Sequence, residues 1–370
     1  MDAVTGMGRI GRRGLIAGLG AGALLPSGAA QAQDFAGRTI EWVIPLAVGG
    51  GSDVWARFHL PFLQRHMAGN PTVVVRNLTG GGGIAGTNQF AARARPDGLM
   101  ILGTTGSVQF PYLLGDPRVR YDYTQWSPLL AGPTGGAAYI DPRYNVRGPQ
   151  DYARLKAAQG LRFGSQGPTS LDLVPKLAFE LLEIDVQIVF GMQGRGQGRL
   201  AFERGETPID YQTSSAFISQ VMPMVREGRA VPLFSWGALN AQGEIVRDPN
   251  FPDMPSFPEF LEAALGRKPS GPAWEAWRTL FIAGFAAQKF VVVPRTTPAA
   301  IQEAYRAAFR RTLVDPEYLS RRGATIGDYD EVTDEAANRA YQLATTIQPE
   351  VRTWVREWLV RKFNHRLTEN

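Results

Sequence analysis

Glycine-rich turns that lead from apolar runs into helical patterns are the residues of this chain best suited to chemistry. Three lie early in the chain, at 49–53, 80–83 and 103–107, and two later, at 165–170 and 191–194. At a helix start, bare backbone N–H groups and the positive end of the helix dipole together attract an anion. Two lobes that face each other with such turns would hold an anionic small molecule at both ends.

The side chains in these turns have a structural interpretation as well. Ser52 and Asp53 can cap the first helix, and glycines serve tight turns. For Asp53 we favour the cap, because a carboxylate repels the anion that its own helix attracts. For Ser52, Thr105, Thr169 and Ser170 capping and ligand binding both stay open.

Cofactor and metal motifs are weak in this sequence. Gly81, Gly83 and Gly86 satisfy G-x-G-x-x-G, but the acidic residue expected at the end of the next strand is missing, since Asp97 precedes that strand. No phosphate-loop motif, metal-binding histidine pair or cysteine is present. We therefore expect neither a cofactor nor a metal.

Catalytic groups are equally scarce. His59 and His66 lie seven positions apart on one predicted helix, where a surface location is the simpler interpretation than a general base. The chain has no G-x-S-x-G nucleophile turn. Arg195 and Arg199 follow a glycine-rich turn and can meet a carboxylate, although solvated arginines are more common. The sequence predicts no enzyme.

Composition narrows the class of protein further. The 370 residues carry 39 basic and 34 acidic side chains, a net charge of +5 that is too thinly spread to indicate nucleic-acid binding.

Residues 1–32 read as an export signal, with Arg12–Arg13 ahead of the apolar run Gly14–Leu25 and a cleavage pattern at Ala30–Ala32. The paired arginines favour the twin-arginine route, and ordinary Sec export stays open. We expect a periplasmic protein cleaved near Ala32.

The mature chain alternates short apolar runs with helical patterns. Thr39–Pro45, Thr72–Val75 and Leu99–Gly103 are predicted strands, and Asp53–Met67 is a predicted helix that Pro61 should kink or split. A second α/β series is predicted from about Ala138 to Trp236, and 240–258 reads as a surface connection. This alternation is typical of an α/β protein with largely parallel sheets flanked by helices.

Several motifs resemble one known family. Ile44–Asp53 followed by Ala56-Arg57 resembles the P-F-x-P-G-G-x-[TS]-D…A-R opening of the Bug (TctC-like) proteins, the periplasmic solute-binding components of tripartite tricarboxylate transporters. Val75–Gly86 resembles their V-x-N-x-x-G-A-G-G-x-x-G, and Pro294–Pro298 their P-x-x-T-P. The sequence departs from the family at Leu46 and Val48, which replace the usual Phe and Pro.

The resemblance implies a type II periplasmic-binding fold, in which two α/β lobes joined by two crossing segments close on a ligand cleft. The crossings are expected near Pro128–Tyr139 and Val231–Ala238. Lobe 1 then comprises 33–135 and 238–370, and lobe 2 comprises 136–237. The protein is expected to be a monomer. The ligand-binding residues predicted from the turns and the resemblance are Gly50, Gly51, Ser52, Asp53, Gly82, Thr105, Gly106, Ser107, Gly167, Thr169, Ser170, Gln193 and Gln212.

The function that the resemblance implies is capture of a small carboxylate and its delivery to the membrane permease subunits of the transporter. Two alternatives stay open at this stage. One is an exported α/β hydrolytic enzyme with Ser52 or Ser170 as nucleophile, which needs a base that the three histidines do not obviously supply. The other is a ligand-binding sensor that docks on a signalling receptor.

Overall fold

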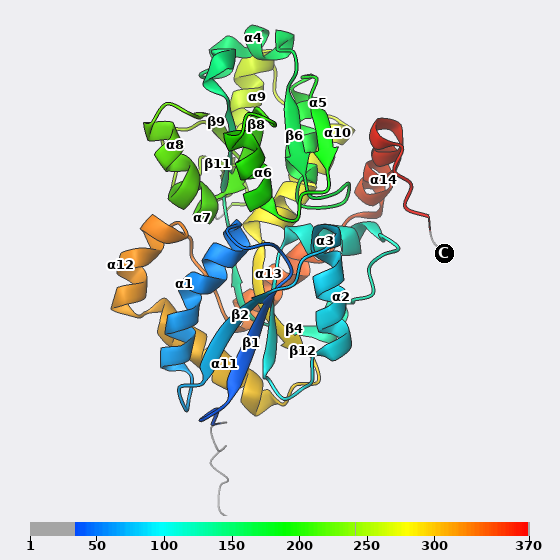
Figure 1. The fold of residues 1–370 in the computed structure, drawn as a ribbon. Helices are drawn as coiled ribbons and strands as arrows, with labels where there is room; N and C mark the ends of the chain where they lie inside the picture. Colours follow the sequence, from blue (N-terminus) through cyan, green and yellow to red (C-terminus); the bar gives the residue numbers. More distant parts are fainter. Residues whose placement is uncertain (1–33, 241, 369–370) are drawn as a thin grey trace, which may run out of the picture. The chain divides into compact units, whose positions relative to one another are not determined.

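The computed structural model describes residues 34–240 and 242–368 of the chain (Figure 1). The predicted export signal, residues 1–32, lies outside the described residues. Within them, no helix is both long enough and apolar enough to cross a bilayer.

A mixed five-stranded sheet, in the order β2-β1-β3-β12-β4, forms the centre of the first lobe. Its first three strands in sequence are parallel, and Trp42 lies opposite Val75 on one side and Ile101 on the other. A strand from much later in the chain, β12, then joins antiparallel between β3 and β4. The strands are β1 (Thr39–Ile44), β2 (Thr72–Asn77), β3 (Met100–Thr104), β4 (Trp126–Gly132) and β12 (Lys289–Pro294).

Each parallel strand of this sheet leads into a helix, as the sequence predicts. The helices are α1 (Gly51–His66), α2 (Ile84–Arg93) and α3 (Gly106–Leu114), and α11 (Ala299–Leu313) packs beside α1 (Figure 1). The buried side chains of β1, α1 and α11 form one core, which includes Trp42, Phe62, Tyr305 and Phe309. The starts of α1 and α3 therefore lie at the carboxyl ends of β1 and β3, where open α/β sheets place their ligands.

Pro61 does not split α1, which is a single helix from Gly51 to His66. Phe58 and Phe62 on either side of it both pack against the ring of Tyr318. These contacts anchor the apolar face of the helix, and the loss of one backbone hydrogen bond at Pro61 is tolerated.

The second lobe is built on a three-stranded antiparallel sheet, β8-β5-β9, and a parallel pair, β6 and β7. Its strands are β5 (Gly136–Ile140), β6 (Arg162–Ser165), β7 (Gln187–Phe190), β8 (Ile209–Thr213) and β9 (Val231–Ser235). Its helices include α4 (Tyr152–Ala157), α5 (Leu173–Leu181) and α6 (Arg195–Glu203). Between β8 and β9 a π-helical segment, Phe217–Val221, separates α7 (Ser214–Ala216) from α8 (Met222–Arg226).

The return of the chain to the first sheet differs from the expectation. The first crossing runs from β4 to β5, but after β9 two more helices, α9 (Phe257–Leu265) and α10 (Pro272–Phe281), stay with the second lobe. Phe257 packs on Phe234 of β9 and on Trp277 of α10, and α10 packs against α5. The return runs through 282–286 into β12 and not through Val231–Ala238, because the apolar faces of α9 and α10 are buried on lobe 2 (Figure 1).

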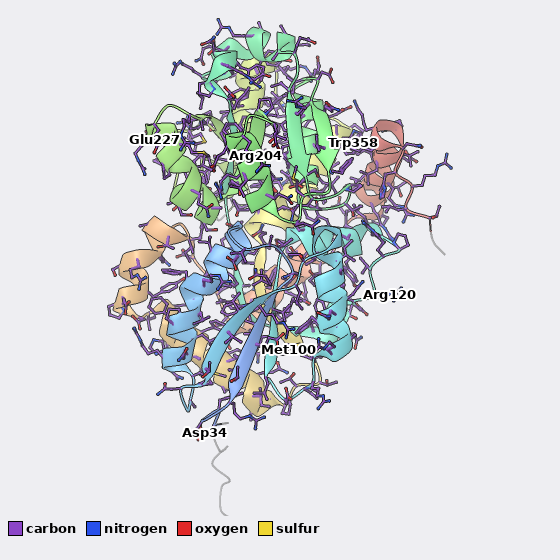
Figure 2. All side chains as sticks on the ribbon, viewed as in Figure 1. Asp34, Met100, Arg120, Arg204, Glu227 and Trp358 are labelled. Atoms are coloured by element: carbon purple, nitrogen blue, oxygen red, sulfur yellow. The ribbon has the colours of Figure 1, made fainter. Side chains whose placement is uncertain are left out.

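Three further helices of the described residues follow α11. They are α12 (Pro316–Thr325), α13 (Asp334–Ala344) and α14 (Pro349–Phe363). Trp358 of α14, labelled in Figure 2, is buried and joins the core of lobe 2, whereas Trp354 stacks on it and is half-buried.

The burial of Trp358 predicts that Trp358→Ala lowers the free energy of unfolding by about 3–5 kcal/mol, because the lost indole leaves a cavity. Trp354→Ala, one helical turn away and only half-buried, should cost about 1 kcal/mol. Urea unfolding followed by circular dichroism measures both. Equal losses for the two variants would contradict the packing described for α14.

Candidate functional site

A cavity between the two lobes gathers most of the predicted first-lobe residues. It encloses about 310 Å³ of empty space, part of it open to solvent. Six predicted ligand-binding residues line it, namely Gly50, Gly51, Ser52, Asp53, Thr105 and Ser107. Six residues outside that predicted set complete the lining, namely Leu46, Leu171, Arg195, Thr213, Gln288 and Lys289, of which the sequence analysis considered Arg195 as a carboxylate partner.

Three helices begin at this cavity. The first residue of α1 is Gly51, and its N-cap, Gly50, provides no side-chain hydrogen bond. The N-cap of α3 is Thr105, whose Oγ1 accepts a 3.4 Å hydrogen bond from the N–H of Ser107. The third helix, α6, begins at Arg195. The first N–H groups of a helix have no partner within it, so the cavity wall is rich in donors and positive potential.

Asp53 lies in the first turn of α1 and is not its N-cap. Its Oδ2 accepts a hydrogen bond from the N–H of Gly49 at 3.0 Å, and its Oδ1 accepts from Arg57 Nε at 2.9 Å and from Asn77 Nδ2 at 3.0 Å. Both carboxylate oxygens are thus engaged by groups of the first lobe. Asp53 braces the glycine turn against β2 and is neutralised by Arg57.

Ser52 meets a residue that the sequence analysis overlooked. Lys289, the first residue of β12, is 2% exposed, and its Nζ donates a 2.9 Å hydrogen bond to Ser52 Oγ. Burial lowers the pKa of Lys289 to about 7, although the charge of Glu331 opposes this shift. A lysine directly ahead of the apolar run Phe290–Val293 was the available signal, since a strand flanked on both sides buries even its end residues.

Arg195 is neither solvated nor free to bind a ligand carboxylate through its guanidinium. It is buried and forms an ion pair with Asp210, and its Nη1 lies 3.5 Å from Asp172 Oδ1. The same guanidinium donates to the backbone carbonyl of Gly164. Arg199 pairs with Glu203 on its own helix. The charge of Arg195 is therefore balanced within lobe 2.

The predicted residues of the second-lobe turn lie outside the cavity lining. Thr169 Oγ1 donates to Asp116 Oδ2 at 2.8 Å, and Ser170 Oγ donates to the Gly167 carbonyl at 3.0 Å. That carbonyl also accepts a hydrogen bond from Lys176 Nζ. These groups are satisfied by one another.

The other four predicted residues also lie outside the lining. Gln212 donates to the Arg195 carbonyl and to Asp210, and the backbone N–H of the exposed Gln193 donates to Gln197. Gly82 and Gly106 lie where the lobes touch. A Cβ at Gly82 would lie 3.3 Å from the Gln166 carbonyl oxygen, and one at Gly106 would lie 2.6 Å from a Leu171 methyl group.

One of the two histidines of α1, His59, is not the surface residue that the sequence predicts, whereas His66 is partly exposed. His59 is fully buried, and its Nε2 lies 2.7 Å from Glu331 Oε2. His66 is paired with Asp315 at 2.8 Å. The expectation failed for His59 because α1 is covered on that side by α12 and by the segment that holds Glu331. Within the described residues no cluster of His, Asp and Glu has the geometry of a metal site.

Gly51 sets how closely the two lobes approach. Ser215 Oγ of lobe 2 donates to the Gly51 carbonyl at 3.0 Å, and Gln220 Nε2 donates to the Gly49 carbonyl at 3.0 Å. A Cβ on Gly51 would lie 1.8 Å from Thr213 Oγ1, which is far inside van der Waals contact. The cavity therefore depends on the absence of a side chain at this position.

We predict that Gly51→Ala pushes the lobes apart, because the new methyl group cannot coexist with Thr213, and overpacking of this kind costs about 1–3 kcal/mol. Small-angle X-ray scattering should show a larger radius of gyration. Gly50→Ala is the matched control, since its Cβ would meet nothing closer than 3.7 Å. An unchanged radius for Gly51→Ala would contradict this account of the interlobe contact.

Comparisons with known proteins agree with the fold and the sequence motifs. No family model matches the chain. A UPF0065 protein of Bordetella pertussis is 27% identical over 304 residues, which cover 80% of this chain and 83% of the relative. A UPF0065 protein encoded between tcbD and tcbE in a Pseudomonas species is 27% identical over 325 residues, covering 85% of each chain.

Solved structures share the architecture at lower identity. The periplasmic binding protein BugD superposes with a TM-score of 0.66 at 19% identity, covering 89% of this chain and 98% of BugD. MatC from Rhodopseudomonas palustris with bound malate gives 0.64 at 20% identity, covering 88% and 98%. An R. palustris protein solved with adipate gives 0.65 at 18% identity, covering 89% and 98%. In sequence the chain is thus similar to UPF0065 proteins, and it shares the two-lobed α/β periplasmic-binding fold of BugD.

Proposed function

We propose that the protein is a periplasmic solute-binding protein that captures a small carboxylate between its lobes. The observation that carries this proposal is the charge of the cavity. Ser52, the starts of α1 and α3, and Lys289 present donors and positive potential, while the one carboxylate in the lining, Asp53, is engaged by its own lobe. MatC with malate and the related protein with adipate support an organic acid as the ligand class.

The energy needed for this function is modest. A Kd near 1 μM corresponds to about −8 kcal/mol. A few charge-assisted hydrogen bonds supply about 1.5–3 kcal/mol each, and burial of apolar ligand surface against Leu46 and Leu171 adds to them. These hydrogen bonds and apolar contacts are enough to bind a ligand, and no catalytic group is needed.

Delivery to the permease subunits of a tripartite tricarboxylate transporter is part of the same proposal. It is supported by the resemblance to the Bug (TctC-like) family, by the export signal expected in residues 1–32 and by the two-lobed fold, in which ligand binding and lobe closure are coupled. A sensor that docks on a receptor would use the same cavity. Binding of the ligand-loaded protein to the permease in reconstituted vesicles distinguishes the two roles.

The enzyme alternative now has a candidate base, because Lys289 lies beside Ser52. We nevertheless place the chain among the non-catalytic members of its fold, since a hydrolase also needs donors set around a developing oxyanion and an open path for water. The cavity is small and narrow, and Lys289 is better placed to hold a negative charge than to reach a scissile bond.

The first prediction from this function concerns a panel of acetate, malate, adipate, citrate and benzoate. At a hundredfold excess over its Kd, a ligand stabilises the folded state by about 2.7 kcal/mol, so at least one of these acids should raise the melting temperature by several degrees. Adipamide and malamide, matched in size but uncharged, should have no effect. The proposal is wrong if none of the acids shifts the transition or if the amides act equally well.

A second prediction concerns the hydroxyl of Ser52. Ser52→Ala removes a donor to the ligand and leaves the Lys289 ammonium without its acceptor, so the Kd of the best acid should rise by about tenfold. Ser320→Ala, an exposed serine on α12, is the matched control and should bind normally. Chromatography of the incubated acid should show no consumption by either protein. Turnover that Ser52→Ala abolishes would establish the enzyme instead.

A further inference from the structure

Lys289 is a buried amine of the cavity, and no carboxylate of the described residues lies in contact with it. Its ammonium group has three N–H donors, and Ser52 Oγ is its single assigned acceptor among the described residues. No carboxylate of the described chain forms an ion pair with it. A buried charge in this situation is costly unless something else pairs with it.

The charged groups around Lys289 are all committed elsewhere. Asp53 of α1 pairs with Arg57, and Arg195 of α6 pairs with Asp210. Glu331, between α12 and α13, is the acidic group whose charge acts on Lys289 most strongly. Glu331 is itself held by hydrogen bonds from His59, Trp55 and Tyr318.

Two other buried polar atoms of the same cavity also lack partners. Thr213 Oγ1 and Gln288 Oε1 are buried, line the cavity with Lys289 and make no hydrogen bond in the described structure. Buried polar groups are nearly always satisfied, and an exception calls for a missing water, ion or ligand. A carboxylate placed at Lys289 would accept from the Thr213 hydroxyl as well as from the ammonium.

We propose that Lys289 is the charged anchor of the ligand, and that Nζ takes up a proton from solvent when a ligand carboxylate binds beside Ser52. This inference rests on the proposed carboxylate-binding function and assigns the residue that recognises the charge. Ser52 keeps Nζ in place by accepting one of its hydrogen bonds, and its own O–H is then free to donate to the ligand.

The proton uptake follows from the environment of the free lysine. Burial lowers its pKa to about 7, so at about pH 8 most molecules hold the neutral amine. A carboxylate within hydrogen-bond distance favours the charged form and raises that pKa. Binding therefore takes up close to one proton at about pH 8 and close to none at about pH 6, where the lysine is already charged. Affinity falls by up to about tenfold per pH unit above 7.

Isothermal titration calorimetry tests this directly. The protein is titrated with the acid of the panel that raises its melting temperature most, at about pH 8 in Hepes and in Tris, whose ionisation enthalpies differ. The slope of the observed enthalpy against the buffer enthalpy gives the number of protons taken up. A slope close to one at pH 8 that vanishes at pH 6 is expected, and a slope of zero at both overturns the inference.

Two variants locate the proton. Lys289→Met keeps a long unbranched side chain, removes the buried charge without loss of melting temperature, and should abolish proton uptake and weaken binding at least tenfold at pH 6. Lys289→Arg stays charged at every pH, so it should bind without proton uptake. Lys268→Met removes an exposed charge and is the matched control. If the Met variant does not fold, the pH dependence of proton uptake in the wild type and the binding of the Arg variant still test the role of Lys289.

The outcomes separate this inference from the function on which it rests. If no acid of the panel binds, the proposed function fails, and Lys289 has no ligand to hold. If an acid binds wild type and Lys289→Met equally, without proton uptake, the binding function stands and the role of Lys289 is wrong.

Discussion

The close approach of backbone to backbone between the lobes is the constraint on which the site depends. Gly51 has no room for a Cβ beside Thr213, and a Cβ on Gly196 would lie 3.2 Å from the carbonyl carbon of Gly49. Ser215 and Gln220 then bond the carbonyls of this turn from the opposite lobe. Because no side chain intervenes, the starts of α1, α3 and α6 reach one small volume. The contact between the lobes requires glycine at this turn, and the convergence of three helix starts follows from that contact.

Most charged side chains around that volume form local ion pairs, and these pairs determine the sign of the electrostatic potential in the cavity. Burial alone would raise the pKa of Glu331, yet the charge of His59 and the hydrogen bonds from His59, Tyr318 and Trp55 hold it below its ordinary value. The Nδ1 of His59 lies 2.9 Å from the Trp55 carbonyl oxygen, and its Nε2 lies 2.7 Å from Glu331 Oε2. Buried pairs of this kind are weak evidence for stability. Their effect is to neutralise the acidic side chains. The electrostatic potential in the cavity then comes mainly from the positive helix starts and from Lys289.

The α/β alternation and the glycine turns were predictable because they depend on local patterns. The first helix begins at Gly51, two residues ahead of its predicted start, and residues such as Ser52 and Thr105 do line the cavity. The apolar run after Lys289 signalled its burial, but its position beside Ser52 was not predictable, because it depends on β12 joining the first sheet after the whole of lobe 2 has been built. The π-helical segments and the burial of His59 have the same origin. They arise from contacts between segments far apart in sequence, which periodicity does not encode.

The cationic and hydroxyl side chains of the cavity lie mainly in the first lobe, which argues against an equal grip on anionic groups at both ends. An equal grip needs free donors in both lobes, and the hydroxyls of Thr169 and Ser170 are already bonded within the protein. The second lobe offers the Thr213 hydroxyl, the start of α6 and the methyl groups of Leu171. A guest would thus meet cationic and hydroxyl donors on one side, and the Thr213 hydroxyl, the start of α6 and Leu171 on the other. Specificity for the body of the ligand then depends on how well it fills the space against Leu171, because apolar contacts discriminate by shape and volume.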